Sequence, residues 1–219
     1  VGGLRGKKEI LFPIDFISKQ KVYGVQFDMR YDNNLFTVDS FITTPRTDGF
    51  VIYDLETAPG VRRVIVLDLA NDSIKTLGGD STAILYAAMS IDSSATPGNY
   101  PVYFENGWES IDPDPLFPAF QLVTDSGIIQ VDRPGDVNLD GNINVADPVS
   151  MIGYIIGSFP LKPRNFATAD VITNDTVDVF DLVGVINLAL GGTLSPVAGQ
   201  PFISQPATIA FAYSDLPAG

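Results

Sequence analysis

Apolar and polar residues alternate in short runs over the first 132 residues, which is the pattern of half-buried β-strands. The clearest run is VYGVQFDMRY, where Val25, Phe27, Met29 and Tyr31 share one face and polar residues take the other. The other runs are EILFPIDF, LFTVDSFI, GFVIYDLE, VRRVIVLDLA, TAILYAAMS, YPVYFEN, PAFQLVT and GIIQVD. Nine strands at this spacing, with no amphipathic helix between them, predict an antiparallel sandwich or jelly roll.

The periodicity changes at Asp132-Arg133-Pro134-Gly135, after which apolar residues recur at steps of three and four, as on one face of a helix. Two segments have this pattern, VSMIGYIIG and FDLVGVINLALGG. At an offset of 34 residues, GDVNLDGNINVADPVSMIGYIIG aligns with ADVITNDTVDVFDLVGVINLALG, and the acids at the start and end of each loop coincide. The pattern therefore predicts a duplicated loop–helix unit.

These changes divide the chain into a sandwich over 1–132, a helical part over 135–192 and a Pro- and Ser-rich tail over 193–219. The tail contains one strand-like run, ATIAFAY, which we expect to pack against a module or pair with a sheet edge, because a free apolar strand aggregates. The four residues that join the first two parts span at most about 14 Å. We therefore expect the helical part to lie beside one end of the sandwich as a fairly fixed unit.

Composition excludes several kinds of chemistry. The 219 residues are 45% hydrophobic, enough for a buried core, and they include no cysteine and no histidine. Disulfides, thiolate nucleophiles, Ser–His triads and imidazole-bound zinc are therefore excluded. The net charge of −13 argues against nucleic acids and anionic membranes as partners but suits cations. No apolar run reaches the roughly 18 residues of a membrane span. The chain begins at Val1 with no signal-like segment, which predicts a mature region or an excised fragment.

The segment GDVNLDGNINVADPV has the spacing of a calcium-binding loop. Calcium takes six to eight oxygen ligands from a loop that bends sharply at a glycine in position 6, and Gly141 has that place. The motif matches D-x-[DN]-x-[DN]-G, but it ends in Asp rather than Glu. The simpler alternative is an Asx-rich surface turn. The candidate ligands are Asp136, Asn138, Asp140, Asn142 through its backbone carbonyl, Asn144 and Asp147.

The second loop is a poorer copy. Ile172 has no side-chain oxygen at position 3, and Asp175 replaces the bending glycine, although Asp adopts left-handed backbone angles more readily than most residues. We expect this loop to bind calcium more weakly or through an additional water. The alternative is a vestigial loop held by helix packing alone. Its candidate ligands are Asp170, Asn174, Thr176, Asp178 and Asp181.

Two calcium loops, each followed by one helix and lacking the preceding helix of an EF-hand, resemble a type I or type II dockerin over about Gly135 to Gly192. KVYGVQFDMRYDNNLFTV and SATPGNYPVYF are similar to segments of cohesin modules, over roughly Arg5 to Asp132. Cohesins are nine-stranded jelly rolls that bind dockerins in bacterial extracellular assemblies such as cellulosomes. The resemblance implies a mostly β chain: a nine-stranded jelly-roll sandwich, then a small helical dockerin module with two calcium (F-hand) loops.

The resemblance also implies contact residues. In dockerins, loop positions 10 and 11 face the cohesin, and here they are Val145 and Ala146 in the first repeat and Val179 and Phe180 in the second. All four are apolar, so we expect recognition by burial, closer to the type II mode than to the polar type I mode. We expect Ala146 and Phe180 to be the more exposed, whereas Val145 and Val179 have packing against the module's own core as an alternative.

The leading interpretation is a non-catalytic extracellular scaffold protein, secreted or attached to the cell surface, that binds a cohesin or dockerin of another polypeptide or another copy of itself. The second is a carbohydrate-binding sandwich carried on a dockerin, with Trp108, Tyr100 and Tyr103 as candidate sugar contacts. The third, a glycoside hydrolase, needs two carboxylates around a cleft and is the least favoured. Its candidate acids are Glu105, Glu109, Asp112 and Asp114.

Overall fold

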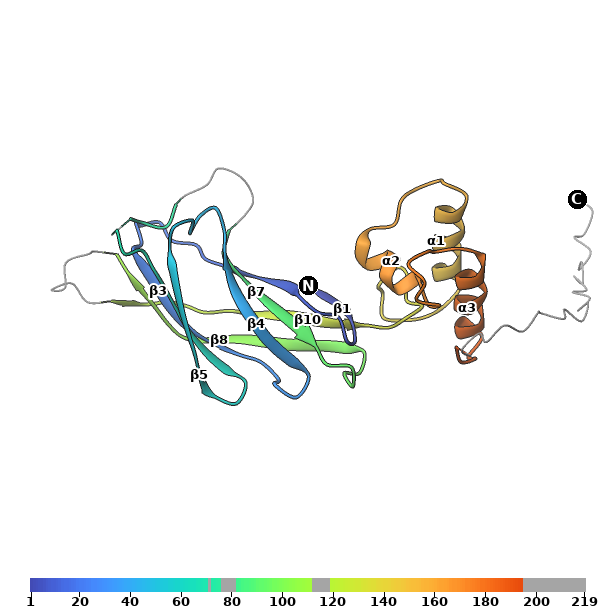
Figure 1. Cartoon of the computed structure of the whole chain (residues 1–219), viewed down its shortest axis with the longest axis horizontal. Helices are drawn as coiled ribbons and strands as arrows, with labels where there is room; N and C mark the ends of the chain where they lie inside the picture. The colour runs from blue at the N-terminus through green and yellow to red at the C-terminus, as the bar shows by residue number, and fades with distance from the viewer. Residues whose placement is uncertain (71, 76–81, 112–118, 195–219) are drawn as a thin grey trace, which may run out of the picture.

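The computed structural model describes residues 1–70, 72–75, 82–111 and 119–194. A β-sandwich is followed by a helical module, which we define as the loops and helices from residue 134 to residue 192 (Figure 1). ATIAFAY lies outside the described residues, and so does the expectation that it joins a sheet.

The sandwich consists of two sheets that contain ten strands in the described residues. The larger has the order β1-β10-β8-β3-β6-β5, with β9 also paired to β8, and the smaller has the order β2-β7-β4. The larger sheet contains β1 (Gly2–Leu4), β3 (Gly24–Arg30), β5 (Val51–Ala58), β6 (Val61–Leu67), β8 (Gly98–Ser110), β9 (Phe120–Gln121) and β10 (Ser126–Asp132). The smaller contains β2 (Ile10–Asp15), β4 (Phe36–Thr43) and β7 (Ala83–Ile91).

Each of the nine predicted runs coincides with one of the strands β2 to β10. The tenth strand, β1, was not predicted, because three residues of sequence Gly-Gly-Leu carry no alternation. It forms by pairing with β10 in parallel, with Gly2 opposite Gln130 and Leu4 opposite Asp132. The strand β1 is therefore an addition to the predicted sandwich, and tertiary pairing rather than local pattern makes it.

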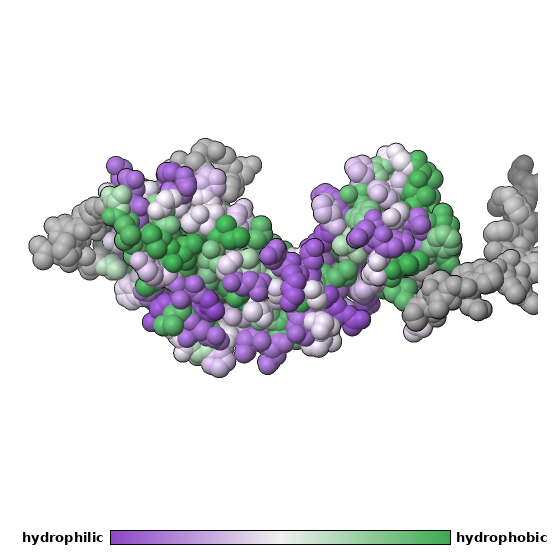
Figure 2. Space-filling view, viewed as in Figure 1, coloured by the Kyte–Doolittle hydropathy of each residue, from purple (hydrophilic) through white to green (hydrophobic). Residues whose placement is uncertain are grey.

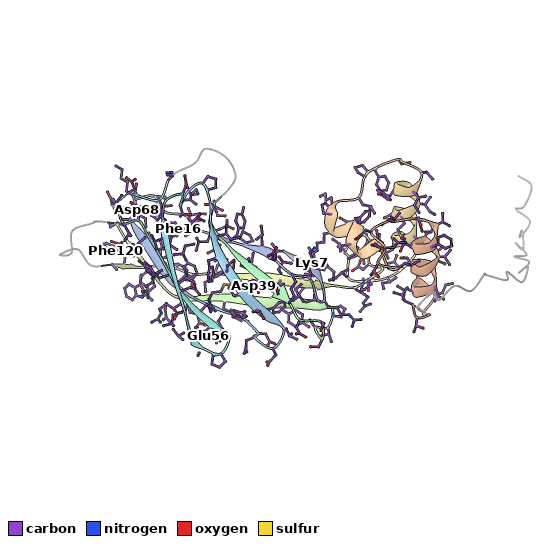
Figure 3. All side chains as sticks on the ribbon, in the orientation of Figure 1. Lys7, Phe16, Asp39, Glu56, Asp68 and Phe120 are labelled. Carbon is purple, nitrogen blue, oxygen red and sulfur yellow. The ribbon has the colours of Figure 1, made fainter. Side chains whose placement is uncertain are left out.

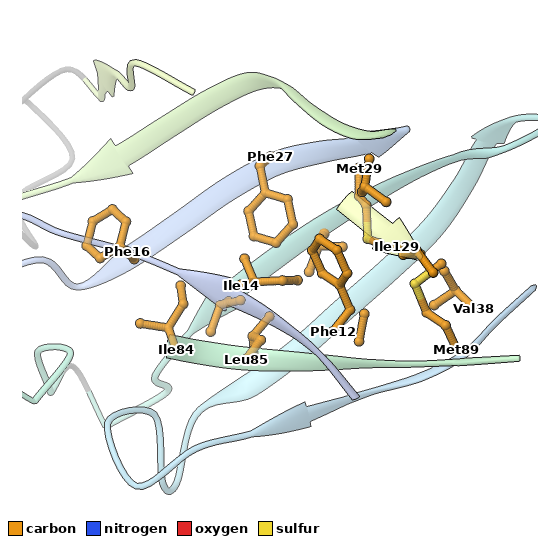
Figure 4. Close-up of a cluster of buried hydrophobic side chains, with 14 of the residues drawn as sticks. Phe12, Ile14, Phe16, Phe27, Met29, Val38, Ile84, Leu85, Met89 and Ile129 are labelled. Carbon is orange, nitrogen blue, oxygen red and sulfur yellow. The ribbon is translucent and has the colours of Figure 1, made fainter. Parts of the chain in front are cut away.

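The core lies between the inner faces of the two sheets (Figure 4). Val25, Phe27 and Met29 of β3 are buried there, as their alternation predicts, and Tyr31 is partly buried against them. Phe27 meets the ring of Phe104 edge-on, with ring centroids 5.6 Å apart. Burial of these side chains supplies the main driving force for folding the sandwich.

Asp28 lies on the opposite face of β3 and is nevertheless only 4% exposed. Nε and Nη2 of Arg63 donate to its two carboxylate oxygens, each at 2.7 Å, and Nδ2 of Asn106 donates to Oδ2 at 2.7 Å. Asn106 is in the left-handed region (φ 49°), where the register of β8 against β3 shifts. The bonds from Arg63 lower the pKa of Asp28 below its ordinary value, against the opposing effect of burial, and Asn106 adds to this. The outer face of the sheet therefore holds a fixed, charged centre.

The helical module contains α1 (Ala146–Ile155), α2 (Pro163–Ala169) and α3 (Val179–Ala189). The two predicted helices correspond to α1 and α3, whereas α2 was not predicted, although Pro163 at its first turn is a recognised start signal. A small core holds the module together, made by Val137, Met151, Ala169, Val177 and Val185. No helix in the described part of the chain is long and apolar enough to cross a membrane.

The helical module lies at the end of the sandwich where β10 finishes, as the short linker predicts (Figure 1). Helix α2 is on the side of the module that faces the sandwich, and it packs against β1. Helices α1 and α3 pack on each other and lie farther from the sandwich.

Replacing Asp28 by Asn should lower the free energy of unfolding of the sandwich by about 1–3 kcal/mol at neutral pH, because Arg63 and Asn106 lose a buried charged acceptor. Since the pKa of Asp28 is lowered on folding, its contribution is present above the ordinary value of 3.8 and is lost as the pH falls through the folded value. The difference between variant and parent should therefore shrink in acid.

Urea unfolding followed by the fluorescence of Trp108, the single tryptophan of the chain, measures this in the sandwich. Glu105→Gln is a matched control, because its pair with Arg30 is exposed on both sides. An Asp28→Asn loss no larger than that of Glu105→Gln would contradict the prediction.

Candidate metal centres

The first and last acids of the first loop are buried and hold its backbone. Asp136 and Asp147 are only 2% and 0% exposed. Asp136 accepts hydrogen bonds from the N–H groups of Asp140 at 3.1 Å and Gly141 at 2.9 Å. Asp147 accepts from the N–H groups of Val137 at 2.7 Å, Asn138 at 3.1 Å and Asn144 at 2.8 Å. The loop is thus wrapped around two carboxylates.

The other predicted ligands of this loop lie closer to solvent. Nδ2 of Asn138 donates to Oδ2 of Asp140 at 2.8 Å, and the N–H of Asn142 donates to Oδ1 of Asp140, also at 2.8 Å. The bond from Asn142 has the larger effect and that from Asn138 adds to it, and together they lower the pKa of Asp140 below its ordinary value. Asn144 is half buried, and its Oδ1 accepts from the N–H of Ala146 at 2.9 Å.

The second loop repeats this geometry. Asp170 accepts from the N–H groups of Asn174 at 3.0 Å and Asp175 at 2.9 Å, as Asp136 does from the equivalent positions. Asp181 is 0% exposed and accepts from the N–H groups of Ile172 at 2.9 Å and Asp178 at 3.1 Å. Each loop therefore has one buried carboxylate at its start and one in the first turn of the helix that follows.

The sharp bend of each loop is made by two residues in the left-handed region. In the first loop these are Leu139 (φ 62°) and Gly141 (φ 89°), and in the second Thr173 (φ 56°) and Asp175 (φ 61°). Asp175 thus takes the backbone angle of the glycine it replaces, as expected from its residue type. The bend needs a backbone angle rather than space, because a Cβ on Gly141 would have no neighbour within 4 Å.

The second loop differs in its donors. Ile172 offers only backbone groups at position 3, as its sequence predicts. Asp178 begins α3, where its Oδ1 accepts from the N–H of Phe180 at 2.7 Å and forms a capping box with Asp181. Asn174 Oδ1 accepts from the N–H of Thr176 at 3.0 Å, and Thr176 is exposed. This loop therefore lacks the side-chain oxygen that Asn138 supplies at position 3 of the first loop.

The electrostatics of both loops suit a cation. Burial, followed by the charge of Asp147, raises the pKa of Asp136 above its ordinary value, against the bonds from Gly141 and Asp140. Among the described residues, no lysine or arginine forms an ion pair with Asp136, Asp147, Asp170 or Asp181. Buried carboxylates are normally paired or bound to a metal, so four without a basic partner are costly as they stand.

No group of three or more acidic side chains gathers tightly enough in the described parts of the chain to hold a metal by carboxylates alone. An ion in either loop would need amide side chains and backbone carbonyls in addition to the two buried acids. A mixed set of carboxylate, amide and carbonyl oxygens is what calcium takes, rather than zinc or magnesium. The residues of both loops therefore fit calcium, the first better than the second.

The four predicted contact residues lie at the starts of α1 and α3. Val145, Val179 and Phe180 are 74%, 57% and 70% exposed, whereas Ala146 is half buried. The expectation that Ala146 is more exposed than Val145 is therefore wrong, because Ala146 is the first residue of α1 and Val145 precedes the helix.

The structure adds exposed apolar residues that the sequence analysis missed. Val149, Ile152 and Ile156 follow Val145 at steps of four, three and four, and all are at least 42% exposed. Val183, Ile186 and Leu190 follow Val179 at the same steps, at the same offset of 34. We call the two sets stripe 1 and stripe 2. The internal repeat was the signal that could have found them, because it pairs every member of one stripe with a member of the other.

The candidates for sugar binding and catalysis are dispersed. Trp108 and Tyr103 are 40% and 43% exposed, but Tyr100 turns into the sandwich, where its ring lies edge-on against Phe36 with centroids 5.4 Å apart. The three aromatics therefore do not form one row. Glu105 is paired with Arg30, and Oε2 of Glu109 is buried without a hydrogen-bond partner among the described residues. Asp112 and Asp114 lie outside the described residues.

Comparisons with known proteins give separate matches for the helical module and for the sandwich. The family model of the dockerin type I domain matches residues 134–190, whereas the sequence resembled both types and its apolar contact positions favoured the type II mode of recognition. Among curated proteins, no sequence matches the chain.

Several solved structures are similar to the sandwich. The sixth cohesin of scaffoldin B from Acetivibrio cellulolyticus, solved in complex with a dockerin, is 19% identical and has a TM-score of 0.48, over 60% of this chain and 94% of that one. CaCohA2 from Clostridium acetobutylicum is 23% identical, with a TM-score of 0.44, over 60% and 85% of the two chains. A non-cellulosomal cohesin from Archaeoglobus fulgidus is 14% identical, with a TM-score of 0.47, over 63% and 89%. The chain thus joins a segment that matches the dockerin type I domain to a β-sandwich that is similar to cohesin modules.

Proposed function

We propose that this chain is a non-catalytic assembly protein of an extracellular, cellulosome-type complex, and that its helical module docks on a cohesin of another polypeptide when calcium is bound. The match of residues 134–190 to the dockerin type I domain supports the kind of interaction. The observation that carries the proposal is the pair of exposed apolar stripes beside the two loops.

The stripes have the character of a docking surface. Members spaced at i, i+4, i+7 and i+11 lie on one face of a helix, and a surface helix normally turns such a face toward a core. In stripe 1 and stripe 2 that face is open to solvent, with Ile156 and Leu190 70% and 82% exposed at the far ends. Figure 2 has apolar surface over α1 and α3 on the side away from the sandwich. Contiguous exposed apolar surface of this kind marks protein interaction sites.

The two calcium loops lead directly into the helices that carry these stripes. Asp147 lies in the first turn of α1 and Asp181 in the first turn of α3, so the closing acid of each loop belongs to the helix that carries a stripe. Bound calcium supplies the positive charge that the buried carboxylates lack. The loop residues then fix where each helix begins, and with it the direction in which its stripe faces.

The arrangement favours a partner on another polypeptide. Helix α2 faces the sandwich, whereas α1 and α3 lie on the far side of it (Figure 1). A linker of four residues is too short to turn the stripes back onto the sandwich of the same chain. The partner of the stripes can also be the sandwich of a second copy of this chain, and the binding experiment below includes that sandwich.

Phe180→Asp should abolish docking through stripe 2, because it places a charge beside Val179 in an interface that relies on burial. Val149→Asp should do the same for stripe 1, and the double variant should bind nothing. Binding of each variant to a panel of immobilised type I cohesins, and to the sandwich of this chain, measures this in calcium. Lys162→Asp is the control, because Lys162 is exposed at the start of α2 and outside both stripes. It changes the net charge more than either of the other substitutions does. Parent-like binding by the double variant would refute the stripes as the docking surface.

Removal of calcium should melt the helical module and leave the sandwich folded. A ligand at a hundredfold excess over its Kd stabilises the folded state by about 2.7 kcal/mol, and the module's core consists of a few residues. Far-UV circular dichroism of the full chain should lose its helical signal with chelator, while the urea transition of Trp108 stays in place. Helical signal that is unchanged by chelator would count against calcium as the resident ion.

Ile172→Asn should tighten calcium binding to the second loop, because it supplies the side-chain oxygen that position 3 lacks. Ile172 is half buried and is not part of the module's core, so the change leaves the core intact. Calorimetric titration should then give two sites of more similar affinity, whereas Ile172→Leu should leave the weaker site as it is. An Ile172→Asn titration identical to that of the parent would show that position 3 does not reach the ion.

A further inference from the structure

One arginine of the helical module, Arg164, forms an ion pair with Asp132, the last residue of the sandwich. Nε of Arg164, on α2, donates to Oδ2 of Asp132 at 2.6 Å, and Nη2 donates to Oδ1 at 2.5 Å. Asp132 ends β10, and its side chain is 1% exposed, whereas that of Arg164 is 30% exposed. A two-pronged pair of this kind fixes direction as well as distance, because the guanidinium and carboxylate must be coplanar.

The same guanidinium lies against β1. A Cβ placed on Gly2 would come within 2.5 Å of Nη2 of Arg164 and 2.2 Å of the carbonyl oxygen of Gln130. Only a residue without a side chain leaves room for the arginine there. Arg164 is therefore seated in a gap formed by two strands of the larger sheet rather than resting on the surface.

Helix α2 also holds both calcium loops. Nδ2 of Asn165 donates to the carbonyl oxygen of Val137 at 2.6 Å, and the carbonyl oxygen of Thr168 accepts from the N–H of Gly135 at 2.8 Å. The helix ends at Asp170, the first acid of the second loop. One helix of seven residues thus contacts the sandwich, the first loop and the second loop.

The first loop itself borders the sandwich on another side. Asp136 and Gly141 line a small cavity of about 130 Å³ together with Gly98 and Asn99, where β8 begins, and Asp132. The loop is therefore placed between α2 and the end of the sandwich. A change in the shape of the first loop would therefore alter its contact with α2 and its contact with the sandwich.

We propose that Arg164 is a positioning residue, which fixes the direction in which stripes 1 and 2 face relative to the sandwich, and that α2 makes this direction dependent on calcium. The linker alone permits rotation about Arg133 and Gly135, so it limits distance without setting direction. The two hydrogen bonds from Arg164 to Asp132 set the direction in which the helical module faces. The strength of this contact depends on whether α2 is ordered, and both loops hold α2 in place. This calcium dependence rests on the proposed function, whereas the role of Arg164 does not.

The distance between the modules can be measured directly, because the chain contains no cysteine. Spin labels at Glu56→Cys on β5 and Ser158→Cys beyond α1 report it by pulsed electron resonance, in the full chain. Both residues are exposed, and Glu56 is at the edge of the sandwich in Figure 3. In calcium the labelled parent should give one narrow distance peak. Arg164→Gln should give a broad distribution in calcium, with helical content and calcium titration unchanged.

Two further variants make the test specific. Arg133→Gln removes the same charge from an exposed neighbour of Asp132 that forms no ion pair in the described residues, and it should stay as narrow as the parent. Arg164→Lys keeps the charge but cannot form both bonds, so it should give an intermediate width. If Arg164→Gln disturbs the fold of the module, Asp132→Asn tests the same contact from the sandwich side.

The outcomes separate the two parts of the inference. A peak as narrow in Arg164→Gln as in the parent, or a parent that is already broad in calcium, overturns the role of Arg164. Broadening of the parent by chelator, together with loss of the helical signal, is the result expected if α2 loses its order with the loops, and a parent that stays narrow overturns the dependence on calcium. If the chain binds no calcium and Arg164→Gln still broadens the peak, the calcium-dependent docking fails while the positioning role stands.

Discussion

The helical module depends on the burial of two carboxylates in each loop. Asp136 and Asp147 in the first repeat, and Asp170 and Asp181 in the second, accept backbone N–H groups from their own loops and form no ion pair with a lysine or arginine among the described residues. Buried charge without a counter-ion is costly, and a core of a few side chains offsets little of that cost. The loops, the starts of α1 and α3 and the stripes on those helices therefore all follow from how this charge is balanced.

Duplication gives the module two equivalent surfaces. Every acid that holds a loop, and every apolar residue of stripe 1, has its counterpart 34 residues later. The copies differ in their ligands rather than in their backbone, because Asp175 adopts the left-handed angle of Gly141 and the N–H of Ile172 bonds to Asp181 like that of Asn138 to Asp147. A loop can thus keep its shape while its donor set weakens.

The described part of the sandwich is held by contacts between its two sheets and by ion pairs on its surface. Three of its acidic and aromatic side chains are held by structural contacts, because Asp28 is bound to Arg63, Glu105 is paired with Arg30 and Tyr100 packs on Phe36. Joined through Asp132 and Arg164, it would present the stripes of the helical module in one direction. A fixed direction suits an assembly protein, because binding then loses less rotational freedom.

The sequence by itself determined the nine strands β2 to β10, the repeat, the position of both acidic loops and the positions of α1 and α3, because alternation, helical spacing and loop motifs are local properties. It did not predict β1, which has no pattern of its own and exists through pairing with β10. Nor did it predict the burial of Asp28, α2 or the grip of Arg164 on Asp132. β1, the bond between Asp28 and Arg63 and the bond between Arg164 and Asp132 were decided by the tertiary structure, because each joins residues that lie about 30 or more positions apart, and a local pattern carries no record of such neighbours. Helix α2 is different, because it is a local element whose start signal, Pro163, was overlooked.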